Sequence, residues 1–359
     1  MADERRLTDW RRFPGKLTRR SLDSVFEPVS FRVGKMELLM KTALVFPGQG
    51  SQAVGMGKAL AAEYSVARDV FARVDSALSQ SLSRLMFEGP EAELTMTANA
   101  QPALMASSIA ALRALETEAG FDAARDAVLV AGHSLGEYSA LCAAGSLTLE
   151  DAARLLRLRG EAMQRAVPVG KGAMAAIFGL DFGVVTRIAT QAASDLYLTG
   201  AVCQAANDNG GGQVVISGTA AAVERAVELA KLAGAKRAKT LPVSAPFHCA
   251  LMQPAALAME TALKGVAIAR PEPSLVANVS ASAVSDPEAI RAGLVAQVTG
   301  AVRWRESVAY MSGQGVARFI ELGTGRVLAG LIKRNAEGST TLSVGTPDDI
   351  AAFMASAGR

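Results

Sequence analysis

One segment limits what this chain can fold into more than any other. The apolar run at 127–131 predicts a buried strand, and it leads directly into the glycine-flanked turn GHSLG at 132–136. Residues 135–144 then have the composition of a helix. A strand, a tight turn and a helix in immediate succession are typical of an α/β sheet, and the serine in such a turn stands at the sheet edge beside a helix N-terminus.

Strands and helices alternate along most of the chain. The predicted strands are 42–46, 127–131, 173–178, 213–217, 238–243, 275–279 and, as the last, 317–321. The predicted helices lie near 56–75, 101–119, 135–144, 149–166, 181–194, 219–234, 250–264 and 304–314, and another begins near 327. This alternation predicts an α/β fold with a mostly parallel sheet and helices on both faces. The βαβα pattern between 173 and 234 indicates a separate small subdomain.

The first forty residues differ from the rest, because they mix arginines with acids and scattered hydrophobic residues without a period. A signal peptide requires an apolar core, which is absent here. A mitochondrial presequence is poor in acids, whereas Asp3, Glu4 and Asp9 are present. Two interpretations stay open for 1–40: a disordered extension, or an upstream start with the true beginning at Met40.

Composition excludes several functional classes. Half of the residues are hydrophobic and a fifth are charged, with no apolar stretch near the roughly 18 residues that cross a bilayer. A net charge of +3 without dense basic runs does not indicate a nucleic-acid partner. Three separated cysteines, Cys142, Cys203 and Cys249, predict neither disulfides nor a metal site and indicate a reducing compartment, the cytoplasm.

Ser134 is the candidate nucleophile. In the predicted turn, the backbone N–H of Leu135 and the helix dipole can stabilise a developing oxyanion. The alternative is an ordinary helix N-cap serine. Cys249, which follows a histidine, is a less favoured alternative nucleophile.

The candidate base follows from scarcity, because the chain contains only two histidines. His133 precedes the serine directly, and adjacent residues around such a turn point in different directions. It is therefore expected to support the loop from beneath, or to be an ordinary buried histidine with its hydrogen bonds satisfied. His248 follows a predicted strand, where loops at the sheet edge carry catalytic groups, and we expect it to activate the hydroxyl of Ser134. No acid stands at a spacing that identifies a partner for His248.

Several segments of the sequence together resemble the malonyl-CoA:acyl carrier protein transacylases of fatty acid synthesis. Several segments occur in the order of that family over about residues 40–350. They are FPGQGSQ at 46–52, GHSLGEY at 132–138, LRG at 158–160, NDN at 207–209 with QVV at 213–215, PFH at 246–248 and ELG at 321–323. The resemblance implies a hydrolase-like α/β core at 41–166 and 241–350, and a small inserted ferredoxin-like subdomain at 167–240.

The resemblance also implies a ping-pong reaction. Ser134 attacks malonyl-CoA, CoA leaves, and the malonyl ester passes to the phosphopantetheine thiol of acyl carrier protein. The expected partners are therefore malonyl-CoA and an acidic carrier protein, with no membrane, no nucleic acid and no resident cofactor. A monomer in the cytoplasm is expected.

Further site residues are carried over from the family. Gln49 and Leu135 would form the oxyanion hole. Arg159 would grip the free carboxylate of malonate with two parallel hydrogen bonds. Asn209 would line the substrate cleft, and Phe247 would favour malonyl over methylmalonyl groups; an ordinary core phenylalanine is the alternative for Phe247.

One position departs from the family pattern. Many members carry a glutamine where this chain has Arg303, and its main-chain carbonyl would orient the catalytic histidine. A backbone role survives a side-chain change, so we expect Arg303 to support His248.

A basic face is expected to dock the acidic carrier protein. The candidates are Lys236, Arg237 and Lys239, or Lys333 and Arg334. The alternative for any single one of them is ordinary solvated surface charge.

Two other functions stay open. A serine esterase or thioesterase would share the nucleophile, but it would need a third, acidic member. A non-catalytic module that docks carrier protein would not need the Ser134 hydroxyl.

Overall fold

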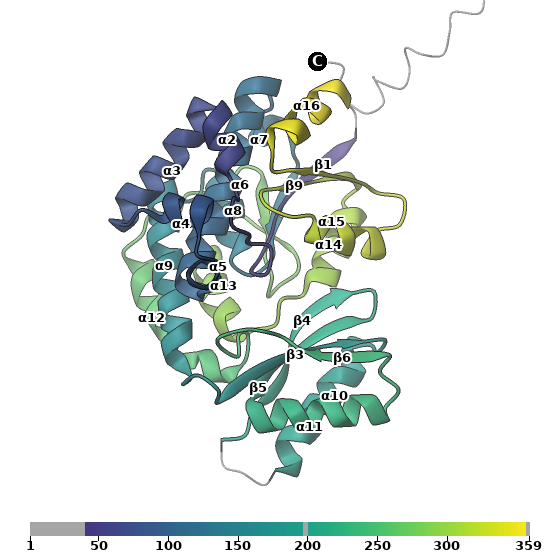
Figure 1. Cartoon of the computed structure of the whole chain (residues 1–359). Helices are drawn as coiled ribbons and strands as arrows, with labels where there is room; N and C mark the ends of the chain where they lie inside the picture. Colours follow the sequence, from purple (N-terminus) through teal and green to yellow (C-terminus); the bar gives the residue numbers. More distant parts are fainter. Residues whose placement is uncertain (1–39, 197–199, 357–359) are drawn as a thin grey trace, which may run out of the picture. The chain divides into compact units, whose positions relative to one another are not determined.

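The centre of the molecule is a six-stranded sheet with the order β10-β9-β1-β2-β7-β8, seen in a computed structural model that describes residues 40–196 and 200–356 (Figure 1). Its strands are β1 (Lys41–Phe46), β2 (Leu129–Gly132), β7 (Ser274–Val276), β8 (Ala283–Val284), β9 (Val316–Leu322) and β10 (Thr340–Val344). Every neighbouring pair is parallel except β7 and β8.

Strand β1 shows why the sheet is buried on both faces. Its alternate residues belong to two different apolar clusters: Leu44 and Phe46 face one, Ala43 and Val45 the other. Helices α14 (Trp304–Gly313) and α15 (Val327–Asn335) cover the second cluster. A continuous apolar strand is what a parallel sheet between two helical layers requires.

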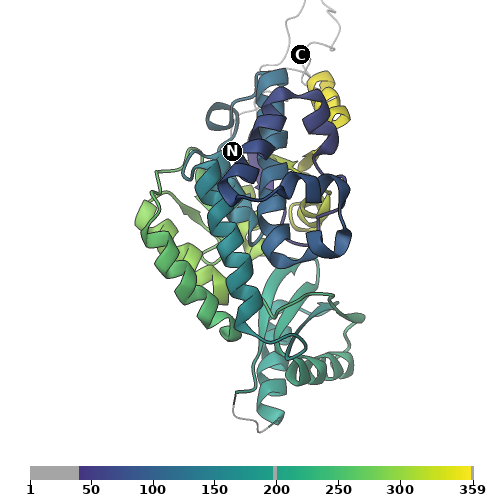
Figure 2. The same cartoon turned by 60° about the vertical axis from the view of Figure 1, so that its left-hand side comes forward.

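The remaining core helices gather largely over the first cluster. They are α2 (Lys58–Glu63), α3 (Ser65–Leu78), α4 (Leu82–Glu88), α5 (Glu91–Thr95), α6 (Thr97–Ala119), α7 (Ala123–Asp126), α8 (Gly136–Ala143), α9 (Leu149–Ala166), α12 (Gln253–Lys264), α13 (Pro287–Thr299) and α16 (Pro347–Ser356), with the 3-10 turn η1 (Ala250–Met252). Helix α9 packs along α6, α3 and α12, and its contact with α12 is clear in Figure 2.

A second, antiparallel sheet forms the small subdomain. Its order is β4-β5-β3-β6, from β3 (Gly172–Phe178), β4 (Cys203–Gly210), β5 (Gln213–Thr219) and β6 (Arg237–Thr240). Helices α10 (Phe182–Asp195) and α11 (Ala220–Leu232) pack on one face of it. The chain order βαββαβ is that of a ferredoxin-like unit. The fold class predicted from the sequence is therefore confirmed.

Strand β4 connects the small subdomain to the core segment between α13 and α14. Backbone hydrogen bonds join Val302 N to Ala206 O at 2.8 Å and Asp208 N to Val302 O at 2.9 Å. The buried Asp208 also pairs with Arg305 of α14 at 2.8 Å. The four-stranded sheet is thereby held to the core through Val302 and Arg305.

Eight helices and strands within residues 40–196 and 200–356 were not predicted, namely α4, α5, α7, α13, α16, β4, β8 and β10, and three of them show why. Strand β10 is half-exposed and polar, so it lacks an apolar run, and it rather than β9 is the last strand. The sequence of β4 predicts a turn because Asn207, Asp208 and Asn209 are polar, yet in the structure all three are buried. Helix α13 was missed although Asp286 caps it and Pro287 begins it, which is a regular start signal.

Two predictions concern the N-terminal extension and membrane-spanning helices. The extension at 1–40 lies outside the described residues, except for Met40. In the described part of the chain, no helix is long and apolar enough to cross a membrane.

Candidate active site

Ser134 stands in a strained turn between β2 and α8. Its φ is 54°, in the left-handed region that non-glycine residues rarely occupy. The flanking glycines are required for close approach: a Cβ on Gly132 would lie 1.9 Å from Gly136 C, and one on Gly136 would lie 2.3 Å from Phe46 O. The backbone of the turn is therefore packed directly against β1, which is the tight strand-to-helix geometry of a nucleophile elbow.

His248 lies within hydrogen-bond distance of Ser134. Its Nε2 lies 2.7 Å from Ser134 Oγ, and its Nδ1 lies 2.9 Å from Gln297 O and 3.2 Å from Gly300 O. Carbonyl oxygens only accept hydrogen bonds, so Nδ1 carries the proton. Nε2 is then the acceptor for the serine hydroxyl, which is the tautomer that a general base requires.

The surroundings keep this histidine neutral. Burial is the main cause that lowers the pKa of His248 to about 3, the Arg159 cation adds to it, and the two carbonyls oppose it. A neutral imidazole is the form that can take a proton from Ser134.

Arg159 is a buried cation with neutral partners. It is 1% exposed and donates to Gln101 Oε1 and Gln297 Oε1, both at 2.8 Å, and to Ser134 Oγ at 3.2 Å. Its Nε has no hydrogen-bond partner. Among the described residues, no carboxylate pairs with it. A buried guanidinium next to a nucleophile, with an unused donor, is suited to bind an anionic group.

The expected oxyanion donors lie at the ends of adjacent strands. Leu135 follows β2 and Gln49 follows β1, and these strands pair in register from Ala43 to Phe46. The half-buried Gln49 donates through its side chain to Thr97 Oγ1 at 3.2 Å, which holds its orientation. Within the described residues, neither backbone N–H has a hydrogen-bond acceptor, which leaves both available to a ligand.

His133 and Asn209 form a separate pair. His133 Nε2 lies 3.0 Å from Asn209 Oδ1, and its ring is 5.8 Å from that of Trp304. Burial lowers the pKa of His133. Asn209 is held in turn by Asn335, which donates to its carbonyl at 2.8 Å. Asn209 thus contacts the loop beside the nucleophile, and no bond links it to Ser134.

The expectation for Arg303 is wrong. The carbonyls that face His248 Nδ1 belong to Gln297 and Gly300, whereas the Arg303 carbonyl accepts the N–H of Ser307 at 2.9 Å. The side chain of Arg303 pairs with Glu306. The physical reason is that Arg303 caps α14, so its carbonyl is used by the first turn of that helix.

Phe247 precedes His248 directly. Its side chain is buried and belongs to the largest apolar cluster of the core.

Sequence reasoning missed three residues beneath the nucleophile. Asn278 Oδ1 accepts the Ser134 N–H at 2.8 Å, and Gln297 Nε2 donates to Ser134 O at 2.9 Å. Both donate a hydrogen bond to Glu137. Burial raises the pKa of Glu137 to about 7, although its hydrogen bonds and the Arg159 cation act to lower that pKa. Available signals were the position of Asn278 just past a parallel strand and the start signal of the helix that carries Gln297.

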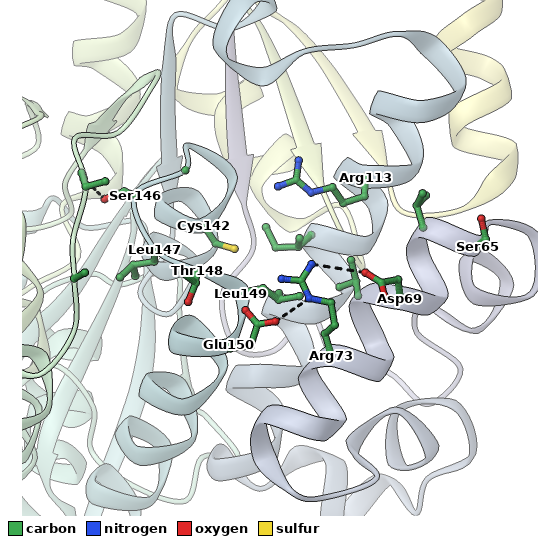
Figure 3. Close-up of a pocket in the computed structure, with 16 residues that line it drawn as sticks. Ser65, Asp69, Arg73, Arg113, Cys142, Ser146, Leu147, Thr148, Leu149 and Glu150 are labelled. Atoms are coloured by element: carbon green, nitrogen blue, oxygen red, sulfur yellow. Dashed lines mark hydrogen bonds and ion pairs between the residues drawn. The ribbon is translucent and has the colours of Figure 1, made fainter.

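A cavity of about 840 Å³ lies away from this site, between α3, α6 and the start of α9 (Figure 3). Arg73, which lines the cavity, forms ion pairs with Glu150 at 2.8 Å and with Asp69 at 3.7 Å. Cys142 lines it, and burial raises the pKa of that thiol to about 12. Burial also raises the pKa of Cys249, which does not favour a thiol nucleophile there. In the described part of the chain, no cluster of His, Cys, Asp or Glu could hold a metal ion.

An α/β sheet that presents a serine on a nucleophile elbow, beside a neutral histidine, defines a class of enzymes that transfer or hydrolyse acyl groups. Residues 43–354 match the family described as the acyl transferase domain, and the chain belongs to this family.

Several relatives are close in sequence and structure. The malonyl CoA-acyl carrier protein transacylase of Bacillus subtilis is 45% identical over 312 residues, which are 87% of this chain and 96% of that protein. The acyl-carrier-protein-S-malonyltransferase of Bartonella henselae is 55% identical with a TM-score of 0.85, over 89% of this chain and 100% of that one. A malonyl-transacylase solved in complex with a type II PKS acyl-carrier protein is 42% identical with a TM-score of 0.83, over 88% and 99% of the two chains.

Proposed function

We propose that this enzyme transfers the malonyl group of malonyl-CoA to the phosphopantetheine thiol of acyl carrier protein and so supplies fatty acid chain elongation. The observation that carries the proposal is Arg159, a buried guanidinium with neutral partners and one unused donor, 3.2 Å from Ser134 Oγ. An acyl group that carries a free carboxylate would place that carboxylate on Arg159 and its thioester carbon at Ser134.

In the first half-reaction, Ser134 Oγ attacks the thioester carbon while His248 Nε2 takes the hydroxyl proton. The N–H groups of Leu135 and Gln49 bind the oxyanion of the tetrahedral intermediate. The carbon–sulfur bond then breaks, CoA leaves with the proton from His248, and a malonyl ester remains on Ser134.

In the second half-reaction, the phosphopantetheine thiol gives its proton to His248 and attacks the ester carbon. The carbon–oxygen bond breaks, Ser134 recovers its proton, and the malonyl thioester of the carrier protein leaves. Both carriers are substrates, and no resident cofactor takes part. The gain of one thioester balances the loss of the other.

Further expectations from the sequence belong to this proposal. The core is divided at 41–166 and 241–350, with the subdomain at 167–240. His133 supports the loop, Asn209 lines the cleft, and Phe247 favours malonyl over methylmalonyl groups. The enzyme is proposed to act as a monomer in the cytoplasm, without membrane or nucleic acid.

Of the two basic groups, Lys333 and Arg334 are favoured for docking the acidic carrier protein. They lie in the last turn of α15, directly before its final residue Asn335, which donates to the Asn209 carbonyl at 2.8 Å beside the candidate site. Lys236, Arg237 and Lys239 lie on and before the edge strand β6.

The test is the intact mass of the protein after mixing with malonyl-, methylmalonyl- or acetyl-CoA. We expect one malonyl adduct, which carrier protein removes, and no adduct on Ser134→Ala. Rapid hydrolysis of malonyl-CoA that carrier protein does not change would instead indicate an esterase or thioesterase. A Ser134→Ala variant that takes no adduct yet keeps full function would indicate a docking module.

A further inference from the structure

Glu137 is a buried carboxylate one turn after the nucleophile. It lies in the first turn of α8 and is 1% exposed. One of its oxygens, Oε2, accepts two hydrogen bonds: from the backbone N–H of Asn278 at 3.0 Å and from Gln297 Nε2 at 2.8 Å. The reaction steps above do not use it, and the cost of burying a carboxylate calls for a reason. We call Glu137, Asn278 and Gln297 the Glu137 cluster.

The other two members of the cluster hold the backbone of Ser134 on both sides. Asn278 Oδ1 accepts the Ser134 N–H at 2.8 Å, and Asn278 Nδ2 donates to Gly132 O at 2.7 Å. Gln297 Nε2 donates to Ser134 O at 2.9 Å. Because Ser134 has a left-handed φ of 54°, these bonds oppose relaxation of the turn.

Gln297 also reaches the cation and the base. Its Oε1 accepts from Arg159 Nη2 at 2.8 Å, and its main-chain carbonyl faces His248 Nδ1 at 2.9 Å. The amide of Gln297 must therefore present oxygen to Arg159 and nitrogen to Ser134 O. A flipped amide would set an NH₂ group against the guanidinium, and two donors cannot bond to each other.

Glu137 Oε2 is the acceptor in both of its hydrogen bonds, and a carboxyl oxygen that receives two N–H groups cannot also bond the side-chain oxygen of Gln297. Glu137 therefore forms a hydrogen bond with the NH₂ group of Gln297 and cannot form one with its oxygen. We infer that Glu137 is a positioning residue, which fixes the Gln297 amide and the Asn278 loop and thereby sets both the geometry of Ser134 and the orientation of Arg159. The part that concerns Arg159 rests on the proposed function; the part that concerns Ser134 does not.

The experiment separates hydrogen-bond acceptance from charge. Glu137→Gln keeps the size and offers an amide oxygen at the same place. Glu137→Met keeps the size and removes the acceptor. The matched controls are Glu321→Gln and Glu321→Met, because Glu321 is also a buried carboxylate that accepts two N–H groups, those of Leu328 and Ala329, away from this site.

Two rates are measured on folded protein. The first is phosphonylation by a fluorophosphonate, which has no carboxylate: Ser134 Oγ bonds to phosphorus, fluoride leaves, and the proton passes to His248. The second is single-turnover loading from malonyl-CoA compared with acetyl-CoA. A wild type that is phosphonylated but takes no malonyl group refutes the proposed function and leaves the first rate as the test of Glu137.

We expect Glu137→Met to lower both rates by about 10- to 100-fold, the loss of one or two buried hydrogen bonds, and to reduce the preference for malonyl-CoA. Glu137→Gln should stay within about threefold of wild type, because the acceptor is retained. The Glu321 variants should lose thermal stability while keeping both rates and the preference.

Wild-type rates in Glu137→Met overturn the inference. Equal losses in Glu137→Gln and Glu137→Met overturn it as well, because they assign the effect to charge. If Glu137→Met does not fold, Glu137→Asp replaces it: the carboxylate is kept but drawn back by one methylene, and about a tenfold loss of both rates is expected. Unchanged rates in Glu137→Asp would then refute the inference.

Discussion

At the scale of single residues, the site depends on which donors have partners and which do not. His248 Nδ1 is committed to carbonyl oxygens, so Nε2 is left for the serine. Arg159 is bound by two glutamine oxygens, its guanidinium has no carboxylate at hydrogen-bond distance among the described residues, and its Nε is unused. An ordinary structural arginine would be paired with a carboxylate instead.

Replacement of Arg159 tests its proposed role. Arg159→Ala should lower malonyl loading by about 100-fold, because a charge-assisted pair of hydrogen bonds is lost, while acetyl loading changes little. The matched control is Arg157→Ala, since Arg157 lies on the same helix but donates to Asn99 and Gln80. Single-turnover loading measures both. A variant at Arg159 that still prefers malonyl-CoA would refute the clamp.

At the scale of elements, Arg159 is positioned by a close helix crossing. Its neighbour Gly160 lies where α9 crosses the start of α6, and a Cβ on Gly160 would be 2.6 Å from both Ala98 Cα and Thr97 O. Both obstacles are backbone atoms, which cannot move aside as a flexible side chain can. The glycine is thus needed for the distance between the two helices.

Gly160→Ala should therefore lower the free energy of unfolding by about 1–3 kcal/mol and slow malonyl loading, because α9 must move and carries Arg159 with it. The matched control is Gly330→Ala on α15, where a Cβ would meet nothing within 4 Å. That control should be neutral or gain up to about 1 kcal/mol from helix propensity. Denaturant unfolding measures both, and equal effects would contradict the crossing argument.

The elements that sequence patterns predicted are those with one strong periodic signal. Strand β1 and helix α9 have it, as an apolar run and as an amphipathic stripe. Strand β4 has a misleading signal, because its polar Asn207 and Asp208 predict a turn, whereas both are buried and Asp208 bonds to Val302 and Arg305 in another part of the chain. The same limit applies to the site: Ser134 and His248 could be found from motif and scarcity, whereas Gln297 could not, since no pattern links it to either.

At the scale of the whole molecule, folding and protonation are coupled. The pKa of His248 is about 3 in the folded chain and 6.5 when it is exposed, so the unfolded chain binds the extra proton. Stability from this group is complete above pH 6.5 and is lost as the pH falls toward 3. Glu137 acts in the opposite sense, because its raised pKa of about 7 favours the folded state at lower pH.

We therefore expect the wild type to lose stability between about pH 6.5 and 3 more steeply than His248→Asn, by up to about 1.4 kcal/mol per pH unit. The measurement is denaturant unfolding at several pH values. The difference between the two proteins isolates His248 from the buried His133 and from Glu137. Parallel curves would show that His248 titrates normally in the folded chain.

The nucleophile turn is the most informative segment of the sequence, and its conformation was determined locally. Glycines at 132 and 136, an apolar strand before them and a helix after them leave few conformations, so Ser134 could be identified from a short stretch of residues. The cluster beneath it was decided by tertiary structure alone. Glu137, Asn278 and Gln297 are far apart in the chain, and only the parallel sheet and the docking of α13 bring them together. Hydrogen bonds between such residues leave no periodic trace in a sequence, because each depends on one distance rather than on a repeated spacing.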